Sequence, residues 1–459
     1  MAKEKMMKAV PITEGNLLKN IILFAIPVVL TGVLQLLLTS ADNFVVGQFC
    51  GSNAIAAIGT AMPVVSLIIE VMIGLSTGAS VCTAQAMGSG NKKEVHDVVH
   101  TALLVAIIGG LALGVSGSVM SKQILTWMSV EGPVLGEATT YLAIYFLGLP
   151  FMLFYNYAAG ILRSTGDTKR PLVYLCISGV VNIALNLFFV LVCGWHIAGV
   201  AAATVMSQAL CAVIISAHLM KTNEAIRLQW RKLRINVLKL KKILKIGIPA
   251  GLQGLVFCLS NVVVQSSINS LGPAVMAGHA AAGNFEAFVY NSMTGVYQSS
   301  VTFTAQHMGA RKIKRMSRAV TLSALLAGGV GLALNLIILL FGRQLLGIFI
   351  VDSAAAIELG IKRMLIICPF HCFCGVLLVY MGAIQSMGAT VAPVVISILG
   401  SCGIRITWLF TAFKAVHTPE MVFWCYPVSW VCTLIAMMTL YYIVRPIQLR
   451  KHGLLDEKE

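Results

Sequence analysis

The sequence predicts an all-α polytopic membrane protein with twelve transmembrane helices in two parallel six-helix repeats. Of its 459 residues, 58% are hydrophobic and only 11% are charged, whereas soluble domains usually carry about 25% charged residues. Apolar runs of about 20 residues, long enough to cross a bilayer as a helix, recur along the whole chain. The two halves also share motifs at a nearly constant offset. Lipid is therefore the expected main solvent of this chain.

Breaking the chain at polar, glycine-proline and charged clusters gives the predicted helices. The first apolar run, from Ile21 to about Val46, is too long for the apolar core of a cleavable signal peptide, so we interpret it as a retained span. The twelve segments centre near residues 33, 67, 108, 149, 183, 208, 257, 289, 330, 370, 403 and 431. Pro27, Pro63, Pro150, Pro249 and Pro369 fall inside them and offer positions for a bend.

The basic residues are distributed unevenly between the two sides of the membrane. Alternating the connections places 27 of the 33 lysines and arginines on the side that holds both termini. Short basic loops face the cytoplasm in membrane proteins, which predicts cytoplasmic termini and a multi-pass protein of the cell membrane. The same loops explain the net charge of +16 through anionic lipid headgroups, without a nucleic-acid partner.

An internal duplication organises the chain. The motif Thr83–Gly88 (TAQAMG) returns as Thr304–Gly309 (TAQHMG), and the glycine-rich pattern that starts at Gly160 returns at Gly382, almost the same distance further along the chain. Parallel repeats of this kind enclose a central site that opens alternately to either side. The expected divisions are residues 1–19 as a cytoplasmic segment, 20–220 as an N-terminal lobe, 221–245 as a basic linker, 246–444 as a C-terminal lobe and 445–459 as a cytoplasmic tail.

Three acidic residues fall inside the predicted spans: Asp42, Glu70 and Glu286. A carboxylate in hydrocarbon costs about 2.5 to 3.5 kcal/mol on insertion scales, so it normally faces a cavity, binds a cation or exchanges protons. We therefore expect cation coupling at Asp42. Glu70 and Glu286 are candidates for a proton relay or for pairing with a cationic substrate.

Asp42 has polar neighbours in the expected helical pattern. One stripe of helix 1, at steps of three to four residues, consists of Thr31, Gln35, Thr39 and Asp42, and a stripe of helix 5 consists of Ser178, Asn182 and Asn186. Oxygen ligands of this type suit a hard cation, and a carboxylate beside amides also takes up a proton. The alternative is interhelical hydrogen bonding, which Asn, Ser and Thr commonly provide in membranes.

Other polar residues have weaker claims. One of the two glutamates has the alternative role of neutralising Arg405, which we interpret as the only arginine inside a span. His279 and His371 are more often hydrogen-bond donors to a backbone carbonyl than functional groups. The twelve cysteines are interpreted as reduced core residues. A soft-metal site at Cys368, His371, Cys372 and Cys374 lacks the separated ligand pairs of structural zinc, so no metal is expected.

Several motifs of enzymes are absent from the sequence. It contains no GxxxxGK[ST] phosphate loop, no HExxH, no GxSxG and no paired CxxC. Neither ATP hydrolysis nor another enzymatic activity is predicted, and no cofactor is expected besides a coupling ion, H+ or Na+. The GxxxG motif at Gly110 and Gly114 indicates close helix packing.

Together, the parallel six-helix repeats, the segment Ser40–Gly47 (SADNFVVG) and the paired TAQxMG motifs resemble the multidrug and toxic compound extrusion (MATE) family over nearly the whole chain. The resemblance implies two six-helix lobes and cation-driven export of amphipathic, usually cationic compounds. It also implies a coupling role for Asp42, with Asn182, Thr204 and Gln35 as the matching polar residues beside it.

Two positions depart from the family pattern. Asn186 stands where some members carry an aspartate, which puts tight sodium binding there in doubt. Gln253 stands in helix 7 where one branch carries an acid, which leaves Glu286 as the nearby candidate for a cation site in the C-terminal lobe. The predicted residues for substrate binding or a proton relay are Gln35, Glu70, Gln253 and Glu286.

The resulting hypothesis is a monomeric antiporter that exports small cationic drugs or dyes in exchange for protons or sodium ions. The runner-up is a flippase for lipid-linked saccharides, which would need several intramembrane cations for an anionic diphosphate. A membrane enzyme lacks a converging catalytic set, and a channel does not explain a duplicated single chain.

Overall fold

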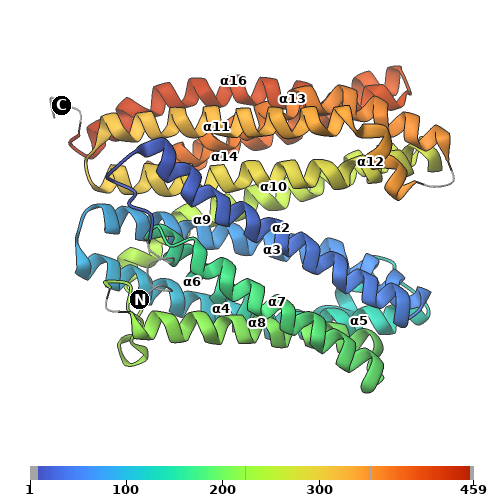
Figure 1. The fold of residues 1–459 in the computed structure, drawn as a ribbon, viewed down its shortest axis with the longest axis horizontal. Helices are drawn as coiled ribbons and strands as arrows, with labels where there is room; N and C mark the ends of the chain where they lie inside the picture. Colours follow the sequence, from blue (N-terminus) through green and yellow to red (C-terminus); the bar gives the residue numbers. More distant parts are fainter. Residues whose placement is uncertain (1–8, 223, 351–352, 455–459) are drawn as a thin grey trace. The chain divides into compact units, whose positions relative to one another are not determined.

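A computed structural model shows a helical protein, described over residues 9–222, 224–350 and 353–454, with no β-strand in those ranges. The α-helices follow the predicted order (Figure 1). They are α2 (Leu17–Phe49), α3 (Ser52–Gly88), α4 (Lys92–Trp127), α5 (Pro133–Leu147), α6 (Leu149–Ser164), α7 (Lys169–Leu187), α8 (His196–Lys221), α9 (Val237–Asn269), α10 (Pro273–Gly309), α11 (Ile313–Leu340), α12 (Gly342–Phe349), α13 (Ala354–Ser386), α14 (Val391–Ser397), α15 (Ile404–Trp408) and α16 (Pro419–Lys451).

These helices confirm the predicted all-helical membrane fold. Within the described residues, ten helical runs are long and apolar enough to cross a membrane, and the bent pair α5 and α6 makes an eleventh. The remaining long helix, α10, has 37 residues and is rich in Ser, Thr, Asn and Gln. It coincides with the eighth predicted span, so the twelve predicted segments all correspond to helical runs.

Of the five prolines predicted as positions for a bend, four lie inside continuous helices and one lies at a bend. Pro27, Pro63, Pro249 and Pro369 lie inside α2, α3, α9 and α13. Pro150 is at the start of α6, where α5 and α6 meet at 45°. The fourth predicted span is therefore a broken helix.

Three π-helical segments interrupt the α-helical pattern close to polar residues. Phe188–Val192 follows α7, Ile398–Gly403 joins α14 to α15, and Leu409–Phe413 follows α15. Single π-turns of this kind are frequent at functional sites. Here they lie close along the chain to Asn186 and Arg405.

The chain forms two compact units. The first consists of Leu30–Gly251 with the described residues up to Val10, and the second consists of Pro11–Val29 with Leu252 onward. Helices α2 and α9 each contribute one part to either unit. In the first unit α4 packs against α5 and α6, and α7 packs against α8; in the second, α13 packs against α10, α11 and α16. The division into lobes at the linker remains a prediction.

The glycines of the GxxxG motif allow close packing in the first unit. A Cβ on Gly110 would lie 2.5 Å from Cα of Pro150, and one on Gly114 would lie 2.9 Å from the carbonyl oxygen of Phe146. Both positions therefore require glycine for α4 to approach the bent pair this closely.

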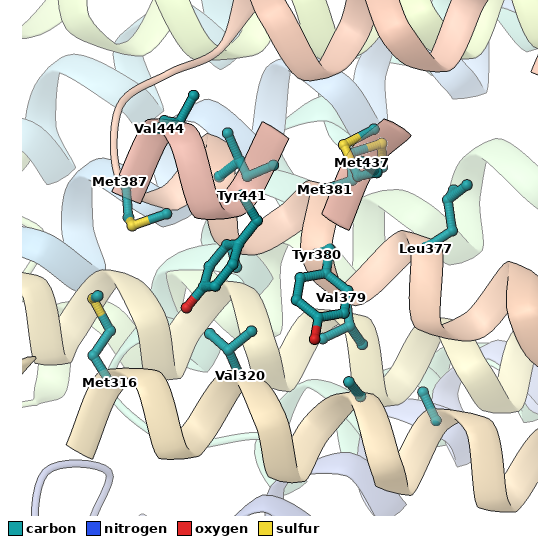
Figure 2. Packing of buried hydrophobic residues seen from close by; sticks show 14 of the residues in the cluster. Met316, Val320, Leu377, Val379, Tyr380, Met381, Met387, Met437, Tyr441 and Val444 are labelled. Carbon is teal, nitrogen blue, oxygen red and sulfur yellow. The ribbon is translucent and has the colours of Figure 1, made fainter. Parts of the chain in front are cut away.

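The core of the second unit lies between α11, α13 and α16, which run side by side (Figure 1). Met316 and Val320 of α11, Tyr380 and Met381 of α13, and Tyr441 of α16 belong to one buried apolar cluster (Figure 2). The rings of Tyr380 and Tyr441 meet edge to face, with centroids 5.2 Å apart. This arrangement packs α13, which carries the buried Arg363, between α11 and α16.

Candidate functional site

A polar group in the first unit brings together the four residues predicted for cation coupling. Asp42 of α2 is half-buried, and its Oδ1 accepts a hydrogen bond of 2.5 Å from Nδ2 of Asn186 on α7. Its Oδ2 lies 3.4 Å from Oγ1 of Thr204 on α8. Thr204 has a single proton and a shorter contact, 3.1 Å, with the carbonyl of Val200. The Asn186 amide is therefore the stronger partner of Asp42.

The two asparagines of α7 contribute further oxygen atoms. Asn182 and Asn186 are one helical turn apart and buried, and Nδ2 of Asn186 lies 3.5 Å from Oδ1 of Asn182. Oδ1 of Asn186 is buried and has no hydrogen-bond partner. An unsatisfied acceptor beside a carboxylate is unfavourable unless a donor or a cation occupies the space. The group of Asp42, Asn182, Asn186 and Thr204 thus offers oxygen ligands to a proton or a hard cation.

Two predicted residues do not join this group. Gln35 of α2 and Glu70 of α3 have exposed side chains, and neither side chain forms a hydrogen bond or ion pair with the described residues. Thr39 uses its hydroxyl to donate to the carbonyl of Gln35, 3.1 Å away on its own helix. Gln35 and Thr39 of the predicted polar stripe on helix 1 therefore do not contact the polar group around Asp42.

Sequence reasoning missed an acid near the start of α5. Glu137 falls outside the predicted spans, but it lies in the helix, and its Oε2 is buried without a hydrogen-bond partner. The predicted span did not include Glu137, because α5 and α6 are joined by a bend at Pro150 and together are longer than one membrane-crossing run. Glu137 is a further ionisable group in the first unit.

The second unit corrects the interpretation of Glu286 and Arg405. Glu286 of α10 does not neutralise Arg405: its Oε2 accepts a hydrogen bond of 2.7 Å from Nη2 of Arg363 on α13. Arg363 falls in a predicted connection, but it is 4% exposed within its helix. The assumption that Arg405 is the only arginine inside a span is therefore wrong.

The Glu286 ion pair has a further partner. Nη1 of Arg363 lies 2.8 Å from Nδ1 of His279 and 2.9 Å from the His279 carbonyl oxygen. Because a guanidinium only donates, Nδ1 of His279 is the acceptor and this imidazole is neutral. His279 therefore helps to position Arg363.

The other predicted residues of the second unit have structural contacts. Gln253 of α9 is buried, and its Nε2 donates to Oγ of Ser397 at 3.1 Å and contacts the sulfur of Met381 at 2.9 Å. His371 stacks on Trp430, with ring centroids 5.1 Å apart. None of the twelve cysteines, all of which lie in the described residues, forms a disulfide. No group of three or more potential metal ligands occurs in the part of the chain that the structure describes.

A many-spanning helical fold with carboxylates and guanidinium groups inside its helices is typical of an integral membrane transporter. The MatE family model matches residues 27–188 and again residues 249–411. The chain belongs to the MatE family, which is a family of transporters and not of enzymes. The two matches also confirm the duplication, because one model describes each half of the chain over a range of nearly equal length.

Relatives and solved structures agree with this assignment. The chain is 27% identical over 444 residues to the probable multidrug resistance protein YoeA of Bacillus subtilis, covering 94% of this chain and 95% of that protein. It is 25% identical over 405 residues to the probable multidrug resistance protein NorM of Thermotoga maritima, covering 86% of each. An outward-facing multidrug resistance MATE family transporter superposes with a TM-score of 0.89 at 21% identity, covering 96% and 99% of the two chains, which shows the shared fold.

Proposed function

We propose that this transporter exports amphipathic organic cations in exchange for protons or sodium ions, by alternating access in the cell membrane. The observation that carries the proposal is the half-buried Asp42 carboxylate, held between α7 and α8 beside an unsatisfied amide oxygen of Asn186. The names of the relatives support multidrug efflux. The basic loops support cytoplasmic termini, and we propose a monomer.

The geometry suggests how ion binding would act on the first unit. Charged Asp42 accepts the Asn186 amide proton, which ties α2 to α7. A protonated carboxyl instead donates one hydrogen bond, and Oδ1 of Asn186 is available to accept it after the amide turns. A sodium ion would take the same oxygen atoms as ligands. Either event changes the bonding between these two helices, as a coupling site requires.

The sign of the buried charge also bears on the cargo. Asp42 has polar neighbours but no cationic partner within ion-pair distance in the described residues, so it remains available to a cation. A flippase for an anionic diphosphate would need several available cations. Arg363 is neutralised by Glu286, which leaves Arg405 as the one buried arginine of the described residues without a carboxylate partner. The balance favours organic cations.

The test is ethidium efflux from proteoliposomes under an imposed proton gradient and, separately, under a sodium gradient. Wild type is compared with Asp42→Asn, which keeps the shape of the side chain and removes its titratable group. Glu131→Gln, a change of an exposed acid between α4 and α5, is the matched control. We expect one gradient to drive efflux in wild type and in the control, and Asp42→Asn to lose it. Coupled efflux by a well-folded Asp42→Asn protein would refute the assignment.

A further inference from the structure

The second unit contains a buried cation without a buried anion to match it. Arg405 of α15 is 3% exposed. Its Nε donates to Oγ of Ser429 at 3.0 Å, its Nη1 lies 3.5 Å from Oδ1 of Asn261, and its Nη2 has no hydrogen-bond partner among the described residues. No carboxylate of the described chain lies within ion-pair distance of it. A guanidinium in this position is costly unless something compensates its charge.

Aromatic rings supply part of that compensation. The central carbon of the Arg405 guanidinium lies 4.5 Å from the ring centroid of Tyr426 and 5.9 Å from that of Trp430. The same Tyr426 ring lies 5.8 Å from the guanidinium of Arg363. Two guanidinium groups therefore share one ring, while Glu286 is the one buried carboxylate in the described part of the second unit. The cluster keeps one excess positive charge.

Unsatisfied polar atoms border this cluster. Oε1 of Glu286, Nε of Arg363 and Nδ1 of His371 are all buried without a hydrogen-bond partner. The rings of His371 and Trp430 stack, which connects His371 to the surroundings of Arg405. Buried polar atoms without partners mark a place where a ligand or water completes the bonding.

The duplication shows where Arg405 stands relative to the cation site of the first unit. Aligning the starts of the two family matches, positions 27 and 249, puts Val264 at the position of Asp42. Aligning their ends, positions 188 and 411, places Arg405 at the position of Asn182. The same alignment places the buried Ser401 at the position of the buried Ser178, and this agreement supports the alignment. The second repeat has thus replaced a carboxylate by an apolar residue and an amide by a guanidinium.

We propose that the second unit binds an organic anion at Arg405, as the counterpart of opposite polarity to the Asp42 site. The ligand class is a carboxylate, because a planar guanidinium donates two parallel hydrogen bonds to a carboxylate and Nη2 of Arg405 is available to donate. Tyr426 and Trp430 hold the guanidinium plane in place. This goes beyond export of cations, since the transporter would also recognise the acidic group of an anionic or zwitterionic cargo.

The probe is benzoate, with the neutral, isosteric benzamide as its control, added to the purified full-length protein in detergent. Binding is measured by isothermal titration calorimetry and by the shift of the melting temperature. We expect saturable binding of benzoate and none of benzamide. Arg405→Gln should weaken benzoate binding at least about tenfold, because it removes a charged hydrogen-bond donor. Lys414→Gln removes an exposed cation nearby in the sequence and should leave binding unchanged.

The outcomes separate this proposal from the ethidium experiment. Equal binding of benzoate and benzamide to wild type would overturn the site without any substitution, even if Arg405→Gln fails to fold. Retention of benzoate binding by a folded Arg405→Gln protein would overturn it too. Equal saturable stabilisation by chloride, lost in Arg405→Gln, would overturn the assignment to an organic acid. None of these results depends on Asp42, so the two proposals fail independently.

Discussion

The buried ion pair of the second unit gives the sharpest prediction of stability. The side chains of Arg363 and Glu286 are only 5% and 11% exposed, and they join α13 to α10. Removing one partner leaves the other charge buried and uncompensated, which costs about 3 to 5 kcal/mol in known cases. We therefore expect Arg363→Met and Glu286→Gln each to destabilise the protein by about that amount.

The double variant should recover most of this loss. With both charges absent, no uncompensated ion remains, so the double variant should lose less stability than the sum of the two single losses. The coupling between Arg363 and Glu286 is measured by a double-mutant cycle on thermal unfolding in detergent. A loss of about 3 kcal/mol corresponds to a fall of the melting temperature by roughly 6 to 12 °C for a domain of about 200 residues.

An exposed pair in the same unit provides the control. Arg343 pairs with Glu358, and their side chains are 71% and 54% exposed. Such pairs contribute at most about 1 kcal/mol, so Arg343→Met should hardly change the melting temperature. An Arg363→Met protein as stable as the Arg343→Met protein would refute the reasoning, because burial would then carry no penalty.

Two further changes test the packing and the linker of the first unit. Gly110→Ala should destabilise the protein by about 1 to 3 kcal/mol, because the new Cβ would overlap the Pro150 backbone. Gly109→Ala is the control and should be tolerated, because the nearest atom to its new Cβ is 3.7 Å away. The two variants are compared by thermal unfolding. Nε2 of His100 accepts the backbone N–H of Gln229 at 3.1 Å, so His100→Phe should speed tryptic cleavage of the linker, and an unchanged cleavage rate would contradict this role.

The fold was predictable because lipid imposes a simple rule on the sequence. Each span needs about 20 apolar residues, so the helices could be counted from the hydrophobic runs, and the parallel repeat followed from the offset between Thr83 and Thr304. The ends of the broken helix at Pro150 were harder to predict, because two helices that meet at 45° form a longer run than a straight span. This longer run includes Glu137.

The sites were predictable only in part. The helical spacing of Asn182 and Asn186 placed both residues on one face, and the structure brings that face to Asp42. The neighbouring residues Lys362 and Arg363 show what the sequence could not predict, namely which of two adjacent basic side chains is buried. Adjacent residues in a helix point about 100° apart, so Lys362 reaches Glu420 at the exposed start of α16, while Arg363 turns inward. Sequence alone gave no sign of the difference.

Because α2 and α9 are each divided between the two units, the two halves of the chain cannot simply be expressed as separate fragments. Helix α2 changes unit between Val29 and Leu30, and α9 changes unit between Gly251 and Leu252. A cut in the linker would therefore yield two fragments that each lack a helix segment of one unit and carry a surplus segment of the other. Neither fragment should be stable when expressed by itself, whereas the two expressed together can exchange these ends.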